Sequence, residues 1–252
     1  MNTVLITGCS SGFGLDIAKF FLDKGWSVVA TMRTPRDGLL PVCDRLRVLP
    51  LDVTDAGSIR DAIEKAGPID VLVNNAGIGW LNALEGTSMA TAREIFETNT
   101  IGTMAMIQAV LPQFRARRAG VIVNVSSTVT LRPLHLLSVY TASKAAVNAF
   151  TESLALELEP FNIRARIVLP GRSPETQFGA NAQGRVKDAG GYPEPYAQIV
   201  QDVFARWAEA PAGLVTSSAA VANAVWRAAT DPACPMRLPA GADAEALMAG
   251  HQ

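Results

Sequence analysis

A tyrosine and a lysine stand four residues apart in a stretch with helical spacing. Tyr140 and Lys144 would lie on one face of a helix, with the ammonium group close to the phenol. A tyrosine ordinarily titrates near ~10, and a neighbouring cation favours the phenolate, which lowers the pKa of the phenol. The pair could therefore give or take a proton near neutral pH. Taken alone it is also compatible with an ordinary helix, because many helical tyrosines have a basic residue one turn later.

Two serines follow a buried apolar segment on the N-terminal side of this pair. Ser126 and Ser127 come directly after residues 121–125, whose composition predicts a strand. Doubly wound sheets build their sites at the carboxyl ends of strands, so Ser127 could donate a hydrogen bond to a substrate oxygen. Serines also commonly end strands and begin turns. The combination of serine, tyrosine and lysine is harder to explain by chance than any one of them.

A glycine-rich loop lies between the first apolar segment and the first helical segment. Gly8, Gly12 and Gly14 would let a phosphate approach the backbone, where N–H groups and the positive end of a helix can hold a pyrophosphate. The spacing is Gly-x-x-x-Gly-x-Gly, which differs from the general dinucleotide pattern Gly-x-Gly-x-x-Gly. A simple strand-to-helix turn is the alternative. The position after the first strand favours a phosphate site that also includes Ser10, Ser11 and Phe13.

Short apolar strands alternate with helical patterns along the whole chain. Strands are predicted at 4–6, 27–31, 46–50, 71–73, 121–125 and 163–169, and helices at 13–24, 58–65, 89–114, 140–158 and 217–230. Strands that are apolar throughout indicate a sheet covered on both faces. We expect an α/β protein: a single Rossmann-like doubly wound domain over residues 1–252, with a parallel sheet of about seven strands and helices on both faces.

Composition and charge exclude several other classes. The 252 residues include 22 basic and 23 acidic side chains, with no basic run that would indicate a nucleic-acid or anionic membrane surface. No segment of about 18 apolar residues predicts a membrane span, and the first strand begins near Met1 without a signal pattern, so a cytoplasmic location is expected. Three separated cysteines and two histidines argue against disulfides and against a metal site.

Residues 3–171 resemble the short-chain dehydrogenase/reductase family. The matching residues are the glycine motif Thr7-Gly8-x-x-x-Gly12-x-Gly14, Asp52 in Leu51-Asp52-Val53, the motif Asn74-Asn75-Ala76-Gly77, Asn99, Ser127, and the Tyr-x-x-x-Lys motif at Tyr140 and Lys144. The resemblance implies an NAD(P)-dependent oxidoreductase that moves a hydride between the nicotinamide and an alcohol/carbonyl pair. It also implies homodimers or homotetramers formed through the helices around Asn99 and Tyr140.

The resemblance assigns a role to each of these residues. Tyr140 would protonate the carbonyl oxygen or take the alcohol proton, and Ser127 would hold that oxygen. Lys144 would bind the nicotinamide ribose and lower the pKa of the tyrosine, while Asn99 would support a water on a proton route. Cofactor contacts are expected from the glycine loop, from Tyr140 and Lys144, and from Arg33, Asp52, Val53, Asn75, Ala76, Gly77, Pro170 and Gly171.

The end of the second strand favours NADP(H) over NAD(H). An acidic side chain there would bind the free ribose hydroxyl and repel a phosphate, but this chain has Met32 at that place. Arg33 follows at once, with Arg36 and Ser11 nearby, so a guanidinium could bind the 2′-phosphate. A solvated strand-end charge is the alternative interpretation of Arg33.

The resemblance weakens after Pro170-Gly171. The family often has a threonine four places beyond this glycine, whereas here Glu175 holds that place and Thr176 follows. Residues 236–244 resemble the branch that contains 17β-hydroxysteroid and retinol dehydrogenases, which makes an apolar, steroid-like substrate conceivable. Residues 172–214, rich in Gly, Pro and Ala, predict a helical lid over the nicotinamide, with apolar pocket candidates at Leu134, Leu136, Leu137, Phe178, Tyr192, Tyr196 and Phe204.

Two alternatives to an NADP(H)-preferring enzyme remain at this point. One is an NAD(H)-dependent alcohol dehydrogenase of the same fold, and the other is a regulator that binds a dinucleotide without catalysis. The presence of Ser127, Tyr140 and Lys144 favours catalysis. A nucleotide-sugar epimerase or dehydratase would need a larger substrate domain than 252 residues allow.

Overall fold

The computed structural model describes residues 1–209 and 213–250 around one parallel sheet of seven strands. The strand order is β3-β2-β1-β4-β5-β6-β7, and all neighbouring strands are parallel. The order in which the strands are added changes from one side of β1 to the other between β1 and β4, which confirms the predicted Rossmann-like α/β fold. The strands are β1 (Thr3–Ile6), β2 (Ser27–Met32), β3 (Leu46–Pro50), β4 (Val71–Asn74), β5 (Gly120–Val125), β6 (Ile163–Pro170) and β7 (Arg237–Ala240).

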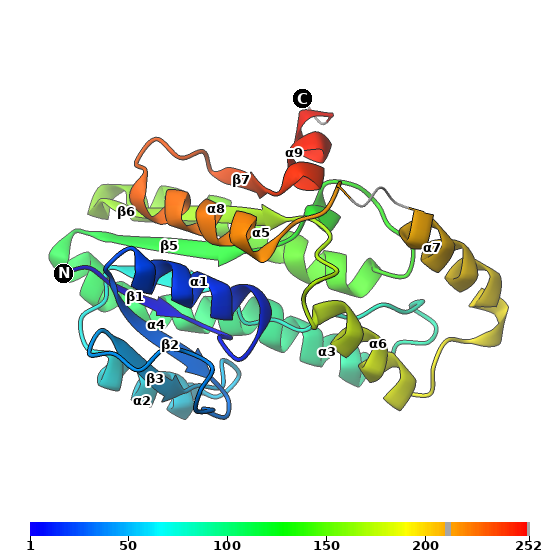
Figure 1. The fold of residues 1–252 in the computed structure, drawn as a ribbon, viewed down its shortest axis with the longest axis horizontal. Coiled ribbons are helices and arrows are strands. Elements are labelled where there is room, and N and C mark those ends of the chain that lie inside the picture. The colour runs from blue at the N-terminus through cyan, green and yellow to red at the C-terminus, as the bar shows by residue number, and fades with distance from the viewer. Residues whose placement is uncertain (210–212, 251–252) are drawn as a thin grey trace.

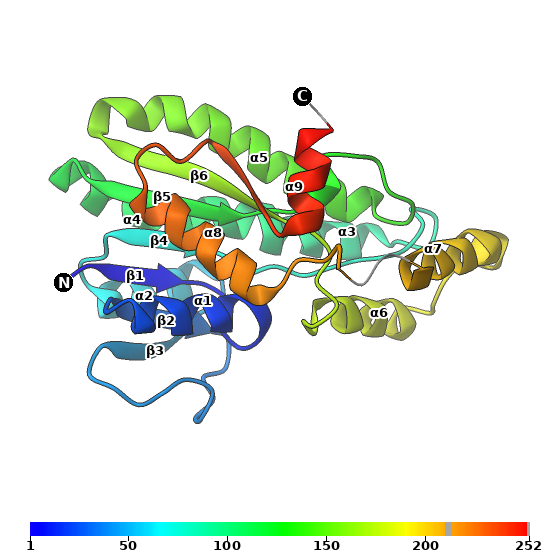
Figure 2. The same ribbon diagram turned by 45° about the horizontal axis from the view of Figure 1, so that its top comes forward.

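Helices cover both faces of the sheet (Figures 1 and 2). On one face α1 (Gly12–Asp23) and α8 (Ser218–Thr230) pack against each other and against Val4 and Ile6 of β1. Leu5 points to the opposite face, which α2 (Ala56–Ala66), α4 (Gly102–Arg117) and α5 (Ser138–Leu158) cover. This alternation along β1 is the two-residue period of a strand buried on both sides. None of the described helices has the length and apolar composition needed to span a membrane.

The segment predicted as one helix over 89–114 is in fact three elements. It consists of α3 (Met89–Phe96), a π-helical turn η1 (Glu97–Ile101) and α4. Asn99 lies inside the π-helical turn and is fully buried. Such turns are rare and occur frequently at functional sites. The 3₁₀ turns η2 (Thr128–Thr130) and η3 (Glu159–Phe161) flank α5.

The region between β6 and α8 extends beyond the carboxyl ends of the strands. It contains α6 (Phe178–Asp188), the 3₁₀ turn η4 (Glu194–Tyr196) and α7 (Ala197–Glu209), which lie together to the right of the sheet in Figures 1 and 2. These helices occupy the segment 172–214 that was predicted to form the lid, of which residues 210–212 lie outside the described residues. The last described helix is α9 (Ala242–Ala249), which follows β7.

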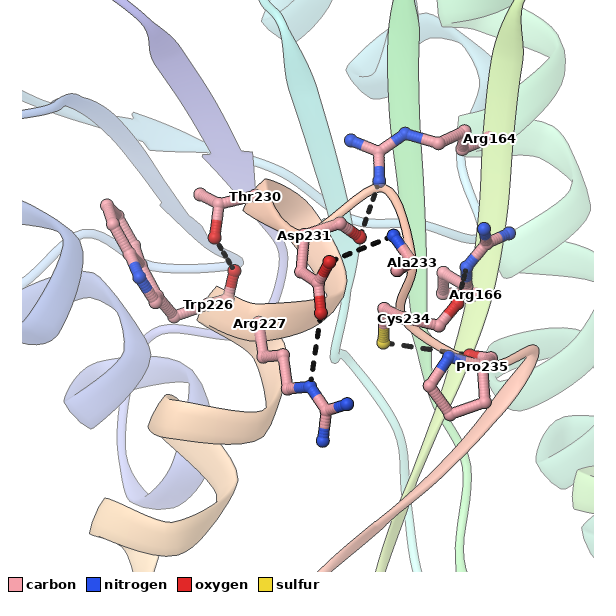
Figure 3. Close-up of polar contacts among 9 residues, drawn as sticks. All are labelled: Arg164, Arg166, Trp226, Arg227, Thr230, Asp231, Ala233, Cys234 and Pro235. Atoms are coloured by element: carbon pink, nitrogen blue, oxygen red, sulfur yellow. Dashed lines mark hydrogen bonds and ion pairs between the residues drawn. The ribbon is translucent and has the colours of Figure 1, made fainter.

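Two arginines of β6 fix the chain that leads into the edge strand β7 (Figure 3). Arg164 donates to the Asp231 carbonyl at 2.9 Å, which Figure 3 shows. It also donates to the Ala229 carbonyl at 3.0 Å, at the C-terminal end of α8, where a cation is favourable. Arg166 donates to the carbonyl of Cys234 at 2.8 Å. Strand β7 was not placed in the sequence analysis, because four residues that include a proline give a weak strand signal.

Candidate active site

A cleft of about 1530 Å³ opens at the carboxyl ends of the central strands and is also lined by residues of α6 and α7. It brings together almost all of the site residues expected from the sequence. Those that line it are Gly8, Ser10, Ser11, Gly12, Phe13, Arg33, Asp52, Val53, Asn75, Ala76, Gly77, Ser127, Tyr140, Lys144, Pro170 and Gly171. Gly14 and Asn99 are not among the lining residues, but both contact segments that line the cleft.

Hydrogen bonds fasten the glycine loop to the segment that follows β4. The Thr7 hydroxyl accepts from the backbone N–H groups of Asn75 and Ala76, at 3.0 and 2.9 Å. The Asn75 amide in turn donates to the carbonyls of Thr7 and Gly8, at 3.0 and 3.2 Å. The two loops therefore form one rigid wall of the cleft.

The glycines of this loop are required by its shape. Gly8 and Gly12 have φ of 75° and 55°, a region that L side chains rarely adopt. A Cβ on Gly14 would overlap the Gly8 carbonyl and the Asn75 amide. The resulting cradle lies at the start of α1, where the helix dipole favours an anion. The residues present therefore fit the pyrophosphate of a dinucleotide.

Tyr140 lies at the floor of the cleft and is only 7% exposed. Burial raises the pKa of Tyr140 well above its usual value, whereas a hydrogen bond with the Ser127 side chain lowers it. The phenol ring also packs against Phe178 of the lid, with ring centroids 5.7 Å apart. The phenol is thus a neutral proton donor next to a second hydroxyl.

Lys144 lies one helical turn from Tyr140 and is also buried. Its ammonium group donates to the Val125 carbonyl at 3.0 Å. Burial lowers the pKa of Lys144 to about 8. The four-residue spacing in the sequence predicts only the attraction between a cation and a phenolate. In the fold, burial is the largest effect on both groups and acts against the charged form of each.

Asn99 connects the π-helical turn to the wall of the cleft. Its side-chain oxygen accepts from Ile78 N–H at 2.8 Å, and its amide donates to the Ile78 carbonyl at 3.0 Å and to the Ser143 hydroxyl at 3.1 Å. Ser143 donates onward to the Tyr140 carbonyl at 2.7 Å. Ser143 was missed in the sequence analysis, and the available signal was a small polar residue on the buried face of a predicted helix.

Arg33 and Asp52 follow β2 and β3 and line the cleft. Arg33 is exposed at the end of β2. The pKa of Asp52 is lowered, mainly by hydrogen bonds from Thr54 and also by the charge of Arg33. Arg36, which was considered together with Arg33, instead donates to the Ser10 carbonyl at 2.6 Å and so supports the glycine loop.

The structure distinguishes between the two residues at which the family pattern departs. Thr176 lines the cleft next to Gly12, and its hydroxyl donates to the Ser173 carbonyl at 3.1 Å. Glu175 is exposed and accepts a hydrogen bond from Ser218 N–H at the start of α8. The threonine therefore faces the expected cofactor position, one residue later than the family pattern has it.

The apolar pocket candidates divide into two groups. Leu134, Leu137 and Phe178 line the cleft. The other four pack in a cluster with Leu81 and Val203: these are Leu136, which precedes α5, and Tyr192, Tyr196 and Phe204 of the segment 172–214. Several further apolar residues line the cleft and were not predicted, because they lie far apart in the chain: Trp80, Leu81, Val203, Trp207, Leu214 and Leu247.

Comparisons with known proteins agree with this architecture. A family model described as short chain dehydrogenase matches residues 2–185. Retinol dehydrogenase 8 of Bos taurus is 42% identical over 182 residues, which are 68% of this chain but only 58% of the bovine protein. A short-chain dehydrogenase from Streptomyces avermitilis has a TM-score of 0.81 at 32% identity and covers 100% of this chain and 93% of its own.

A further solved structure, the closed form of serine dehydrogenase complexed with NADP+, has a TM-score of 0.77 at 28% identity. The match covers 94% of this chain and 93% of the serine dehydrogenase chain. The family match, the sheet order and the assembled cleft confirm the resemblance seen in the sequence. The chain belongs to the short-chain dehydrogenase family.

Proposed function

We propose that this protein is an NADP(H)-preferring oxidoreductase that interconverts a carbonyl and a secondary alcohol, with Tyr140 as the general acid/base. The observation that carries the proposal is that Ser127, Tyr140 and Lys144 line one cleft, with the Tyr140 and Lys144 side chains buried one helical turn apart. A bound nicotinamide would supply or accept the hydride.

The side chains account for the proton in this reaction. A neutral Tyr140 donates its proton to the carbonyl oxygen during reduction, while the Ser127 hydroxyl holds that oxygen by a hydrogen bond. In the reverse direction the same phenol must lose its proton to solvent first, and Lys144 would favour that form when it is charged. Asn99 and Ser143 orient the start of α5, on which Tyr140 is carried.

The cofactor would lie along the length of the cleft. The glycine loop would hold the pyrophosphate, Asp52 and Val53 the adenine side, and Pro170, Gly171 and Thr176 the nicotinamide side. Arg33 is exposed at the ribose end, where a guanidinium can bind a 2′-phosphate. The similarity to a dehydrogenase structure that contains NADP+ supports this preference.

The substrate would be a small, mainly apolar carbonyl compound or alcohol. The lid end of the cleft carries Trp80, Leu134, Leu137 and Trp207, and the similarity to retinol dehydrogenase 8 supports an apolar ligand. We place the protein in the cytoplasm, as a homodimer or homotetramer of single-domain chains, with 172–214 as the substrate-side lid.

A panel of carbonyl compounds with NADPH, followed by NADPH absorbance, tests this proposal. Tyr140→Phe should lower turnover by a factor on the order of 10², because a general acid typically contributes about 10² to 10⁴. Its affinity for NADPH should stay near the wild-type value. Tyr196→Phe, which alters a lid tyrosine outside the cleft lining, is the matched control. A Tyr140→Phe enzyme with wild-type turnover on its best substrate would remove the assignment, and NADPH binding without turnover on any substrate would favour a regulator.

A further inference from the structure

Both ends of the lid meet at one buried threonine. Thr216 follows the lid, is fully buried, and its N–H donates to the Arg172 carbonyl at 2.8 Å. Its hydroxyl accepts from Gly171 N–H at 2.8 Å. Gly171 precedes the segment 172–214 and Arg172 is its first residue, so these two hydrogen bonds join the two ends of that segment.

Asp243, in the first turn of α9, completes this arrangement from the C-terminal end of the protein. One carboxylate oxygen accepts from Arg172 N–H at 2.7 Å, and the other lies 2.7 Å from the Thr216 hydroxyl. The Thr216 hydroxyl is also 2.7 Å from the Ala240 carbonyl, so its single proton has two available acceptors. The backbone N–H groups of both Gly171 and Arg172 are thus bound to this pair of side chains.

Two glycines show how closely the chain is packed around the pair. A Cβ on Gly171 would overlap the Asp243 carboxylate. A Cβ on Gly241, whose φ is 103°, would overlap the Thr216 side chain. The backbone therefore passes directly against the two hydrogen-bonding groups, and small movements of either group would be transmitted to Gly171.

We propose that Thr216 and Asp243 are positioning residues that set the Gly171–Arg172 backbone at the nicotinamide end of the cleft and hold the neck of the lid. Gly171 and Asp243 both line the cleft, so the fixed backbone is part of its wall. The catalytic consequence rests on the proposed function, whereas the fixing of the backbone does not. Helix α9 thus contributes to the geometry of the site through Asp243.

The two Asp243 variants separate hydrogen bonding from charge. Asp243→Ala removes both acceptors. Asp243→Asn keeps the shape and can keep the bonds, because its amide oxygen can accept from Arg172 N–H while its NH₂ donates to the Thr216 hydroxyl, which then donates to Ala240. Glu245→Ala is the matched control, because it removes a negative charge from the same first turn of α9 at an exposed position outside the cleft lining.

Hydrogen exchange on the full chain without cofactor tests the fixing of the backbone. Asp243→Ala should speed exchange at least tenfold in peptides that contain 171–172 and 216, while Asp243→Asn and Glu245→Ala should stay close to wild type. Thr216→Val, which keeps the volume but lacks the hydroxyl, should behave like Asp243→Ala, and Thr216→Ser should restore protection. Unchanged exchange in Asp243→Ala and Thr216→Val, or equal acceleration in Glu245→Ala, would overturn the proposal.

Steady-state kinetics with NADPH and the best carbonyl substrate test the consequence for catalysis. Asp243→Ala should lower kcat by about tenfold or more, because small misplacements of reacting groups cost rate, while Asp243→Asn should remain within a few-fold of wild type. Equal losses in the Ala and Asn variants would overturn the hydrogen-bond explanation in favour of charge. If the wild-type chain reduces no carbonyl, the proposed function fails while the exchange experiment still decides the fixing of the backbone.

Discussion

The two ionisable groups at the centre of the site are governed by burial. Tyr140 and Lys144 are 7% and 5% exposed, and desolvation disfavours the charged form of each, which raises the pKa of the phenol and lowers that of the amine. The spacing of four residues predicted their proximity correctly. It carried no information about how deeply the sheet and the lid bury them, and that depth decides their protonation.

The pKa of Lys144 predicts how cofactor affinity depends on pH. With a pKa of about 8, the amine is charged below that pH and loses its proton as the pH rises through it. NADPH affinity should therefore weaken as the pH rises above about 8, because the ammonium group that would bind the nicotinamide ribose becomes neutral. Fluorescence titrations across this range provide the measurement. Lys144→Met should bind more weakly at all pH values without this step, and a flat wild-type profile would contradict the assignment.

Arg33 provides a second test at the residue scale. A hydrogen bond to a charged group contributes roughly 1.5–3 kcal/mol, so Arg33→Ala should weaken NADPH binding by about ten- to a hundredfold and leave NADH almost unchanged. Arg36→Ala is the informative comparison. Arg36 supports the glycine loop through the Ser10 carbonyl, so its loss should affect both cofactors alike. Tighter binding of NADH than of NADPH by the wild type would show that the phosphate assignment is wrong.

At the scale of elements, the regular alternation of strands and helices was predictable and its interruptions were not. The apolar runs that became β1, β2, β4, β5 and β6 are buried on both faces, which is the pattern that periodicity detects. The π-helical turn at 97–101 has five residues of which only Ile101 is apolar, so it is too short and too polar to show a periodicity in the sequence. Its position follows from the hydrogen bonds of Asn99 to Ile78 and Ser143, which are contacts between distant segments.

The burial of α7, in the proposed lid, predicts how fast its amides exchange with solvent. Only Val203 of α7 is fully buried, whereas α5 buries eight residues along its length. Amides of α7 should therefore exchange faster than those of α5 in the cofactor-free protein. Binding of NADPH and substrate should slow exchange in α7, because the ligand would cover the lid face that contains Val203 and Trp207. Strong and equal protection of α7 with and without ligands would contradict a moving lid.

At the scale of the whole molecule, the cleft joins parts of the chain that are far apart in sequence. Its lining includes Gly8 from the first loop, Tyr140 from α5, and Asp243 and Leu247 from α9. A ligand that contacts all of these segments binds only the assembled fold. Its binding energy is therefore added to the stability of the whole sheet rather than to one local element.

This linkage predicts the thermal behaviour of the protein and of a core variant. NADPH at a hundred times its Kd should stabilise the fold by about 2.7 kcal/mol, which corresponds to a rise in Tm of roughly 5–10 °C for a chain of this size. Leu72→Ala removes a fully buried side chain from β4 and should cost about 2–5 kcal/mol. The variant should therefore melt earlier, yet keep the same rise with NADPH, because Leu72 does not line the cleft. Melting curves with and without cofactor measure both effects, and a variant that folds but no longer gains stability from NADPH would show that the core and the cleft are not independent.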